Sequence, residues 1–469
     1  MTLKTSVVIL CLLCSCPAGA QKRSALVNFR HLEHLTERIQ LSGEAVDIVH
    51  IYSNYPDYSW VSAQESGPEG IACVDDAARA AVLYLRAYEA WSDRASLRRA
   101  TTLLRFVLDM QTPDGEFYNF LFADHSINRE GRTSYKSFGW WAARGVWAMG
   151  LGFRILRDKD AGLSARLRVG MERCLPHVDS LLAKHGRVRS LAGYRVPEWL
   201  LYGSGTDATP ELVLGLTEFY AATLDTAVGR RIRELADGIM MMQDGNGSRY
   251  PYGLHRSWET QWHMWGSAQT EALACAGRIL KSDTMIASAE REARGWFSRL
   301  LIQGFCKEMD IGTPGAPVTR FEQIAYGVSP ITVGLIRVSE ATGKTEYLKM
   351  AGLFSSWFFG DNVLRKPLYD PLTGLAYDGI RDSVTINLNS GAESTIETLL
   401  ALLAVERSPL AAEYLSYRKL ASGKRGELLF AVFRNDAGGQ IAITVDGRSG
   451  EMKVLEGEEC ESLVREAVR

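Results

Sequence analysis

A helix-length segment rich in Ala, Gly, Ser and Thr recurs along this chain at intervals of roughly 60 residues, and such recurrence indicates a repeat architecture. Each segment follows a polar or aromatic loop. The segments are residues 73–91, 138–156, 206–224, 265–280, 327–341 and 391–406. Because small residues let helices approach closely, we expect these segments to pack side by side as an inner ring.

A second set of segments lies between them and has a larger polar share with wider charge alternation. These segments are residues 29–45, 97–110, 163–183, 228–242, 285–303 and 345–358. Such amphipathic sequences suit outer helices with one face in solvent. The alternation predicts an all-α fold, an (α/α)6 toroid or six-hairpin barrel, as a catalytic domain over residues 21–407.

Residues 408–469 have a different pattern. Short β-prone runs at 427–434, 440–445 and 451–455 are separated by turn sequences rich in Asn, Asp and Gly. We expect a small β-rich C-terminal region, an antiparallel meander that covers part of the toroid. A separate binding role for this region is the alternative.

The N-terminus has the features of a signal peptide over residues 1–20. Lys4 precedes an apolar run, and small residues stand before Gln21. We expect an exported protein, periplasmic or extracellular, with no transmembrane segment after signal removal. Leu13-Cys14-Ser15-Cys16 resembles a bacterial lipobox, which would make Cys16 a lipidated residue, but we favour cleavage after Ala20.

Composition argues against several classes of protein. The chain is 46% hydrophobic with a formal net charge of -2, so it has no basic footprint for nucleic acid. The cysteines after the leader are widely spaced, which indicates neither a disulfide framework nor a zinc site. Asp244, Asn246 and Ser248 alternate as in a calcium loop, but His255 stands where that loop needs Glu. We therefore predict no metal and no cofactor.

Three carboxylates are the predicted catalytic residues. Asp75 and Asp76 open the first small-residue segment, where a helix N-terminus favours negative charge, so helix capping is the simpler interpretation. However, the inner helices should all begin at one end of the ring, and Glu393 opens the last of them. Ring closure would bring the three together, and a carboxylate pair across a cleft is what hydrolysis of a glycosidic bond requires.

Aromatic and polar side chains cluster in the loops before the inner helices. Aromatic rings stack on the apolar faces of sugars while polar groups bond hydroxyls, although some of these rings should simply fill the centre of the ring. The predicted substrate-binding residues are Tyr58, Trp60, Tyr118, Asn119, Trp141, Arg144, Glu198, Asp207, Trp258, Glu259, Trp262, His263, Tyr369, Asp378 and Asn389.

Several motifs resemble those of the six-hairpin glycosidase-like superfamily. They are Val74-Asp75-Asp76-Ala77-Ala78-Arg79-Ala80, Asp114-Gly115-Glu116-Phe117-Tyr118-Asn119-Phe120, Ser137-Phe138-Gly139, Phe359-Gly360-Asp361-Asn362 and Asn389-Ser390-Gly391-Ala392-Glu393. Within it, the chain resembles the toroid proteins associated with bacterial glycosyltransferase-like and mannoside-phosphorylase systems, which implies the toroid and suggests carbohydrate processing. Ala77 stands where that family has Asn, and Ser390 where it has Gln, whereas the three carboxylates are kept.

We therefore predict an exported glycoside hydrolase-like protein that acts on an oligo- or polysaccharide. A polysaccharide lyase acting on a uronate-containing glycan is one alternative, and a non-catalytic carbohydrate-binding toroid is another. The lyase would need a Tyr or His base beside a cation, and its candidates are Tyr135, Lys136, Arg144, Arg195, His255 and Arg256. A sugar epimerase is less favoured, because two facing histidines would be expected and only His255 and His263 lie near the proposed mouth.

Overall fold

The computed structural model describes residues 26–313 and 315–467. The predicted signal peptide and Cys16 lie outside the described residues. Within the described ranges, no helix combines the length and the apolar character needed to cross a bilayer.

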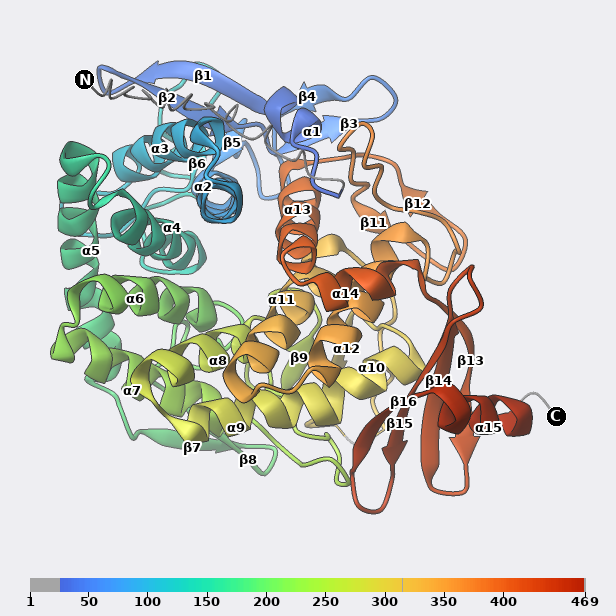
Figure 1. Ribbon diagram of the computed structural model, residues 1–469. Coiled ribbons are helices and arrows are strands. Elements are labelled where there is room, and N and C mark those ends of the chain that lie inside the picture. Colours follow the sequence, from blue (N-terminus) through green and yellow to red (C-terminus); the bar gives the residue numbers. More distant parts are fainter. Residues whose placement is uncertain (1–25, 314, 468–469) are drawn as a thin grey trace, which may run out of the picture.

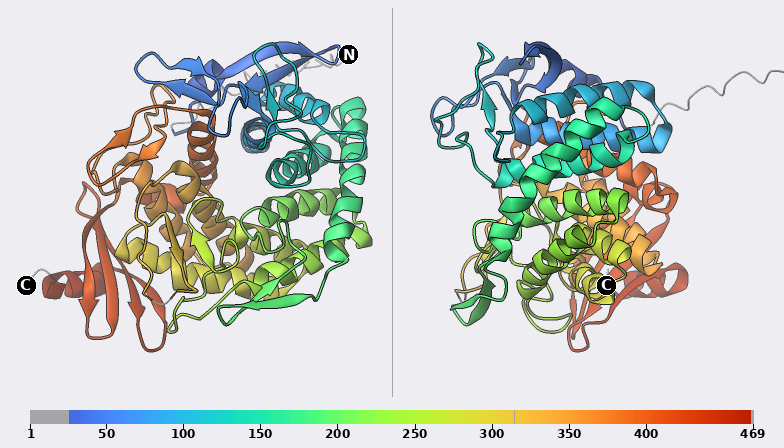
Figure 2. Two further views of the ribbon diagram at one scale, coloured as in Figure 1. Left: turned by 180° about the vertical axis from the view of Figure 1, so that it is seen from behind. Right: turned by 90° about the vertical axis from the view of Figure 1, so that its left-hand side faces the viewer.

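The small-residue segments form the inner helices of a ring (Figure 1). These are α2 (Val74–Trp91), α4 (Trp140–Leu156), α6 (Thr209–Thr223), α8 (Gln269–Leu280), α11 (Ala325–Thr342) and α13 (Ala392–Glu406). Each packs against the next, and α13 packs against α2, so the first and last of them are neighbours. Figure 2 shows the same ring from behind.

Close backbone approach explains why the inner helices need small residues. Where α4 crosses α6, a Cβ atom at Gly150 would collide with the carbonyl oxygen of Gly215, and one at Gly215 would collide with Val146. The inner helices are therefore buried on nearly all sides: α6, for example, buries every residue from Thr209 to Thr217.

Amphipathic helices lie outside the ring. They are α3 (Arg94–Asp109), α5 (Ala161–Leu182), α7 (Thr226–Met241), α9 (Asp283–Glu292) and α12 (Glu346–Ser355). A π-helical turn, η1 (Ala293–Phe297), continues α9 into α10 (Ser298–Gln303). Asp93, Asp160 and Asp225 cap α3, α5 and α7, because their carboxylates accept hydrogen bonds from backbone N–H groups of the first turn.

The predicted outer helix at residues 29–45 is wrong. The chain there forms only a five-residue helix, α1 (Arg30–His34), followed by the hairpin of β1 (Thr36–Leu41) and β2 (Glu44–Val49). Ser42 and Gly43 have φ of 50° and 85°, as in the tight turn that matches hairpin twist. Strand β2 packs on α3, so this hairpin covers the surface that a helix was expected to cover.

Loops at the end where the inner helices begin carry short antiparallel strand pairs. The pairs are β3 (Tyr52–Asn54) with β4 (Ser59–Val61), β5 (Ala72–Cys73) with β6 (Phe120–Leu121), β7 (Val188–Leu191) with β8 (Tyr194–Pro197), β9 (Gln261–His263) with β10 (Glu308–Asp310), and β11 (Gly379–Ile380) with β12 (Ile386–Asn387). They fix the long loops against the helices that follow them.

The C-terminal part is a four-stranded antiparallel sheet. Its order is β13 (Arg418–Arg425), β14 (Leu428–Arg434), β15 (Gln440–Asp446) and β16 (Met452–Glu456). Helix α15 (Gly457–Ala467) packs on β15 and β16. Helix α10 packs on β13, β14 and β15. A short connection, α14 (Pro409–Glu413) and η3 (Tyr414–Ser416), joins the ring to the sheet. Strands β14 to β16 overlap the three predicted strands.

Candidate active site

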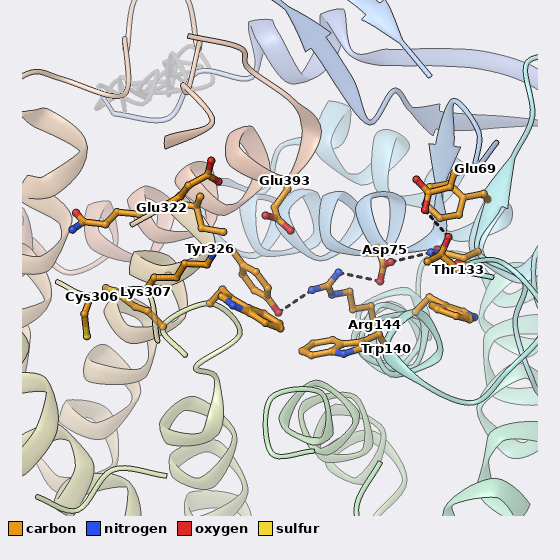
Figure 3. A pocket seen from close by; sticks show the side chains of 18 residues that line it. Glu69, Asp75, Thr133, Trp140, Arg144, Cys306, Lys307, Glu322, Tyr326 and Glu393 are labelled. Carbon is orange, nitrogen blue, oxygen red and sulfur yellow. Dashed lines mark hydrogen bonds and ion pairs between the residues drawn. The ribbon is translucent and has the colours of Figure 1, made fainter. Parts of the chain in front are cut away.

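A cavity of about 510 Å³ opens where the inner helices begin (Figure 3). Helices α2, α4, α11 and α13 contribute Asp75, Arg144, Tyr326 and Glu393. The full lining is Glu69, Asp75, Asn119, Phe120, Thr133, Trp140, Trp141, Arg144, Met264, Trp265, Cys306, Lys307, Glu322, Gln323, Ile324, Tyr326, Gly327 and Glu393. The cavity therefore joins side chains from the first and last inner helices.

A second cavity of about 460 Å³ adjoins the first. Both are lined by Glu69, Asp75, Phe120, Arg144, Glu322, Ile324 and Glu393. The second one also reaches Asp76, Arg79 and Asp378. Asp75 and Glu393 thus lie where the two cavities meet.

Arg79 of α2 organises one group of acids. Its guanidinium donates to Asp76 at 2.7 Å, to Glu393 at 3.1 Å and to Glu397 at 3.3 Å. Asp76 and Glu397 are buried, whereas the side chain of Glu393 is 44% exposed. Among the described residues, none donates a hydrogen bond to the second oxygen of Glu393, which leaves that oxygen free to meet a ligand.

Arg144 of α4 organises a second group. It forms ion pairs of 3.0 Å with both Asp75 and Glu211, and it donates to the Tyr326 hydroxyl at 2.8 Å. Tyr326 in turn donates to Glu211 at 2.8 Å. Asn119 donates to the other oxygen of Asp75 at 3.2 Å. Asp75 is thereby fixed from two sides at the cavity wall.

Burial shifts the proton affinities of the groups behind the cavity. It raises the pKa of Glu397 to about 7, although Arg79 opposes the shift. Burial also raises the pKa of Asp76 and of Glu211, opposed by Arg79 and Arg144 respectively. The pKa of Tyr326 lies well above its ordinary value, mainly because the phenol is buried. These buried groups bind Arg79 and Arg144, the two arginines that hold Glu393 and Asp75 at the cavity.

The structure brings together part of the predicted site. Asp75, Glu393, Asn119, Trp141 and Arg144 line the main cavity. Asp76 and Asp378 line only the adjoining one. Asp378 accepts from the backbone N–H of Gly391 and from Ser394, so it orders the start of α13. Asp76 is 2% exposed beneath Arg79, which fits a role in positioning Arg79 rather than contact with substrate.

The other predicted substrate-binding residues do not line either cavity. They are Tyr58, Trp60, Tyr118, Glu198, Asp207, Trp258, Glu259, Trp262, His263, Tyr369 and Asn389. Some have packing roles: Trp262 is buried against Trp296, and Trp60 stacks on His50. His263 contacts Asp207 at 3.1 Å and stacks on Trp265, so these two residues support a ring that does line the cavity.

The residues proposed for a lyase are mostly elsewhere. Lys136 pairs with Asp114 and Glu116 near the surface. His255 is buried against Glu292 and Ser288, and Arg256 is buried against Asp244. Arg144 alone among these candidates lines the cavity, and no described histidine lines either cavity.

Sequence reasoning missed several cavity residues. Tyr326 begins α11 in the same way that Asp75 begins α2, so the rule that pointed to Asp75 could have found it. Lys307 and Glu322 come from loops without periodicity, where no pattern marks them. No group of three or more metal-binding side chains with suitable geometry occurs within residues 26–313 and 315–467.

No protein-family model matches the sequence, and no curated protein matches it. Solved structures do match. A cellobiose 2-epimerase from Bacillus thermoamylovorans B4167 superimposes with a TM-score of 0.56 at 10% identity, over 80% of this chain and 96% of that one. A sugar epimerase from a ruminal bacterium and a D-mannose isomerase each superimpose with a TM-score of 0.50 at 13% identity, over 76% of this chain and 91% of theirs.

These likenesses define the class of fold. The chain shares its overall fold with these sugar epimerases and with the D-mannose isomerase. At 10–13% identity, the likeness shows the architecture and does not identify the reaction.

Proposed function

We propose that this protein is a carbohydrate-processing enzyme, a glycoside hydrolase that cleaves an oligo- or polysaccharide in the cavity lined by Asp75 and Glu393. The observation that carries the proposal is that two carboxylates from helices α2 and α13 face the same cavity, each bound by its own buried arginine. Hydrolysis of a glycosidic bond needs such a pair, one group to protonate the leaving oxygen and one to act at the opposite face of the sugar.

The surroundings of the two carboxylates suggest different roles. Asp75 is bound by Arg144 at one oxygen and Asn119 at the other, so it suits the ionised partner, a base or nucleophile. Glu393 is also paired with an arginine, Arg79, but it keeps one oxygen free of described partners and is the more exposed, so we assign it the place of the proton donor. A donor must present an unshared oxygen to the glycosidic oxygen within hydrogen-bond reach.

The walls of the cavity suit a sugar chain. Trp140, Trp141 and Trp265 offer flat apolar rings, on which the C–H faces of pyranoses stack. Asn119, Lys307 and Gln323 offer polar groups for hydroxyls. The cation Arg144 lies 5.2 Å from the Trp140 ring centre, which holds that ring in place.

The finer architecture and the location of the protein belong to the same proposal. We assign the chain to the (α/α)6 toroids, with the β1–β2 hairpin and α1 standing in for one outer helix. We propose that residues 1–20 are removed on export to the periplasm or exterior, which fits a role on extracellular glycans.

A screen of the purified mature chain against defined plant, fungal and bacterial glycans tests the proposal. Hydrolysis releases saturated sugars with a mass gain of one water, and Asp75→Asn strongly slows that release. Products that absorb as unsaturated sugars would instead identify a lyase. Binding without any release, unchanged in Asp75→Asn and Glu393→Gln, would identify a carbohydrate-binding toroid.

Tyr326 makes the lyase the weaker alternative. It lies beside Arg144, as a lyase base lies beside its cation, but its hydroxyl donates a hydrogen bond to Glu211 and burial raises its pKa. A base that abstracts a proton near neutral pH needs the opposite shift.

A further inference from the structure

A third cavity, of about 340 Å³, lies between the ring and the C-terminal sheet. It is separate from the cavities around Asp75. The end of α10, the loops at 304–305 and 320–323, the loop after α12, and strands β13 and β14 enclose it. Gln323 lines both this cavity and the main one, so the two lie on opposite sides of one wall.

The charges around this third cavity do not balance. Its lining includes three cationic side chains, Arg320, Arg365 and Lys419, against one carboxylate, Asp361. Asp361 is already bound by Arg365 at 2.8 Å and by the backbone N–H of Lys419 at 2.7 Å. Neither Arg320 nor Lys419 has a carboxylate partner among the described residues. Two cationic groups therefore line the cavity without an ion-pair contact to a carboxylate of the described residues, while Asp361 acts on Lys419 from a greater distance.

The ammonium group of Lys419 lies at the cavity wall and makes only weak contacts with the described residues. Its ammonium donates at 3.5 Å to the carbonyl of Ile302 and lies 5.7 Å from the Phe433 ring centre. Burial lowers the pKa of Lys419 to about 8, while Asp361 opposes the shift and Arg365 adds to it. Trp357 also lines the cavity, and its buried indole N–H has no hydrogen-bond partner in the described chain.

We infer that the cavity between α10 and β13 is a second binding site, which takes the carboxylate group of an acidic saccharide against Lys419 and Arg320. The walls carry both elements such a ligand needs. Phe321 offers an apolar ring to a pyranose face, and the two cations offer donors to its carboxylate. Binding at this site does not require catalysis at Asp75, so this inference is independent of the proposed hydrolysis.

Calorimetric titration of the mature full chain with a trigalacturonate tests this site, with maltotriose as the neutral probe and inorganic phosphate as the other anion. We expect trigalacturonate to bind and Lys419→Met or Arg320→Gln to weaken it at least tenfold, while Lys419→Arg retains it. Lys424→Met is the matched control, because Lys424 lies on the same strand but points its exposed side chain at Glu427. Its affinity should equal that of the unchanged protein.

The pH dependence gives an independent measurement. Raising the pH from 7 to 9 removes the charge of Lys419 and should release the trigalacturonate, whereas Lys419→Arg should keep its affinity. The other charged groups that act on Lys419 are Asp361 and Arg365.

Other results would overturn the inference. Trigalacturonate binding that is equal in Lys419→Met and the unchanged protein would place the ligand elsewhere. Binding of phosphate without trigalacturonate would show a site for small free anions and exclude the saccharide. Equal affinity for maltotriose would exclude recognition of the carboxylate.

Discussion

Arg79 and Glu393 are 314 positions apart in the chain and 3.1 Å apart in the structure. The same guanidinium binds Asp76, its neighbour on α2. One buried cation therefore fixes the carboxylate that opens the last inner helix to the carboxylate that opens the first. The position of Glu393 at the cavity depends on this contact, and the following predictions test the arrangement around it.

Asp75→Asn and Glu393→Gln should each lower kcat on the cleaved glycan by about 10²–10⁴-fold, the range for removal of a general acid or base. The substitutions preserve shape, so circular dichroism should show unchanged folding. Glu172→Gln is the control, because Glu172 is an exposed carboxylate on α5 paired with Arg168. Full activity in both cavity variants would rule out the proposed pair.

Arg79→Met should destabilise the protein by about 3–5 kcal/mol, since it leaves Asp76 and Glu397 buried without their cation. Arg168→Met, at an exposed ion pair, should change stability by less than about 0.5 kcal/mol. Urea unfolding followed by tryptophan fluorescence measures both. Equal stability of the two variants would show that Arg79 does not hold the acids together.

Glu397→Gln should change how stability depends on pH. Burial raises the pKa of Glu397 to about 7 from an ordinary value of 4.5, so the folded state keeps a proton that the unfolded state releases between these values. The unchanged protein should therefore lose on the order of 3 kcal/mol relative to Glu397→Gln as the pH rises from 4.5 to 7. Urea midpoints at several pH values measure this, and a difference that does not vary with pH would contradict it.

Two glycine substitutions should have opposite effects. Gly150→Ala places a Cβ against the carbonyl oxygen of Gly215 and should destabilise by about 3 kcal/mol. Gly162→Ala, in the exposed first turn of α5, meets no close atom and should stabilise by about 0.5–1 kcal/mol. Thermal unfolding compares them. Similar shifts in both would show that α4 and α6 can move apart at no cost.

Much of the ring could be predicted because its inner helices must pack closely, and close packing requires small residues that the sequence shows directly. Segments rich in Ala, Gly, Ser and Thr became α2, α4, α6, α8, α11 and α13, since only small side chains permit backbones to approach as closely as at Gly150 and Gly215. The region at 29–45 was mistaken for a helix. Its polar and apolar residues fit both periods, and the turn at Ser42-Gly43 decides for the hairpin.

The site was less predictable than the fold. Helix starts gave Asp75 and Glu393, because that position is set by the ring itself. The ring does not set the direction in which a side chain points. Asp76 stands next to Asp75 in sequence yet turns beneath Arg79, and Trp262 turns into the core while Trp265 reaches the cavity. Such choices depend on contacts with distant segments, such as Trp296, that no local pattern reports.

The contact between α13 and α2 also governs when the molecule can first work. Asp75 leaves the ribosome early, whereas Glu393 arrives after most of the chain has been made. A nascent or truncated product that ends before α13 would have an open seam at α2 and half of its acidic pair. If Asp75 and Glu393 act as the proposed pair, the protein would stay inert throughout synthesis and become active in one step, when its last inner helix docks.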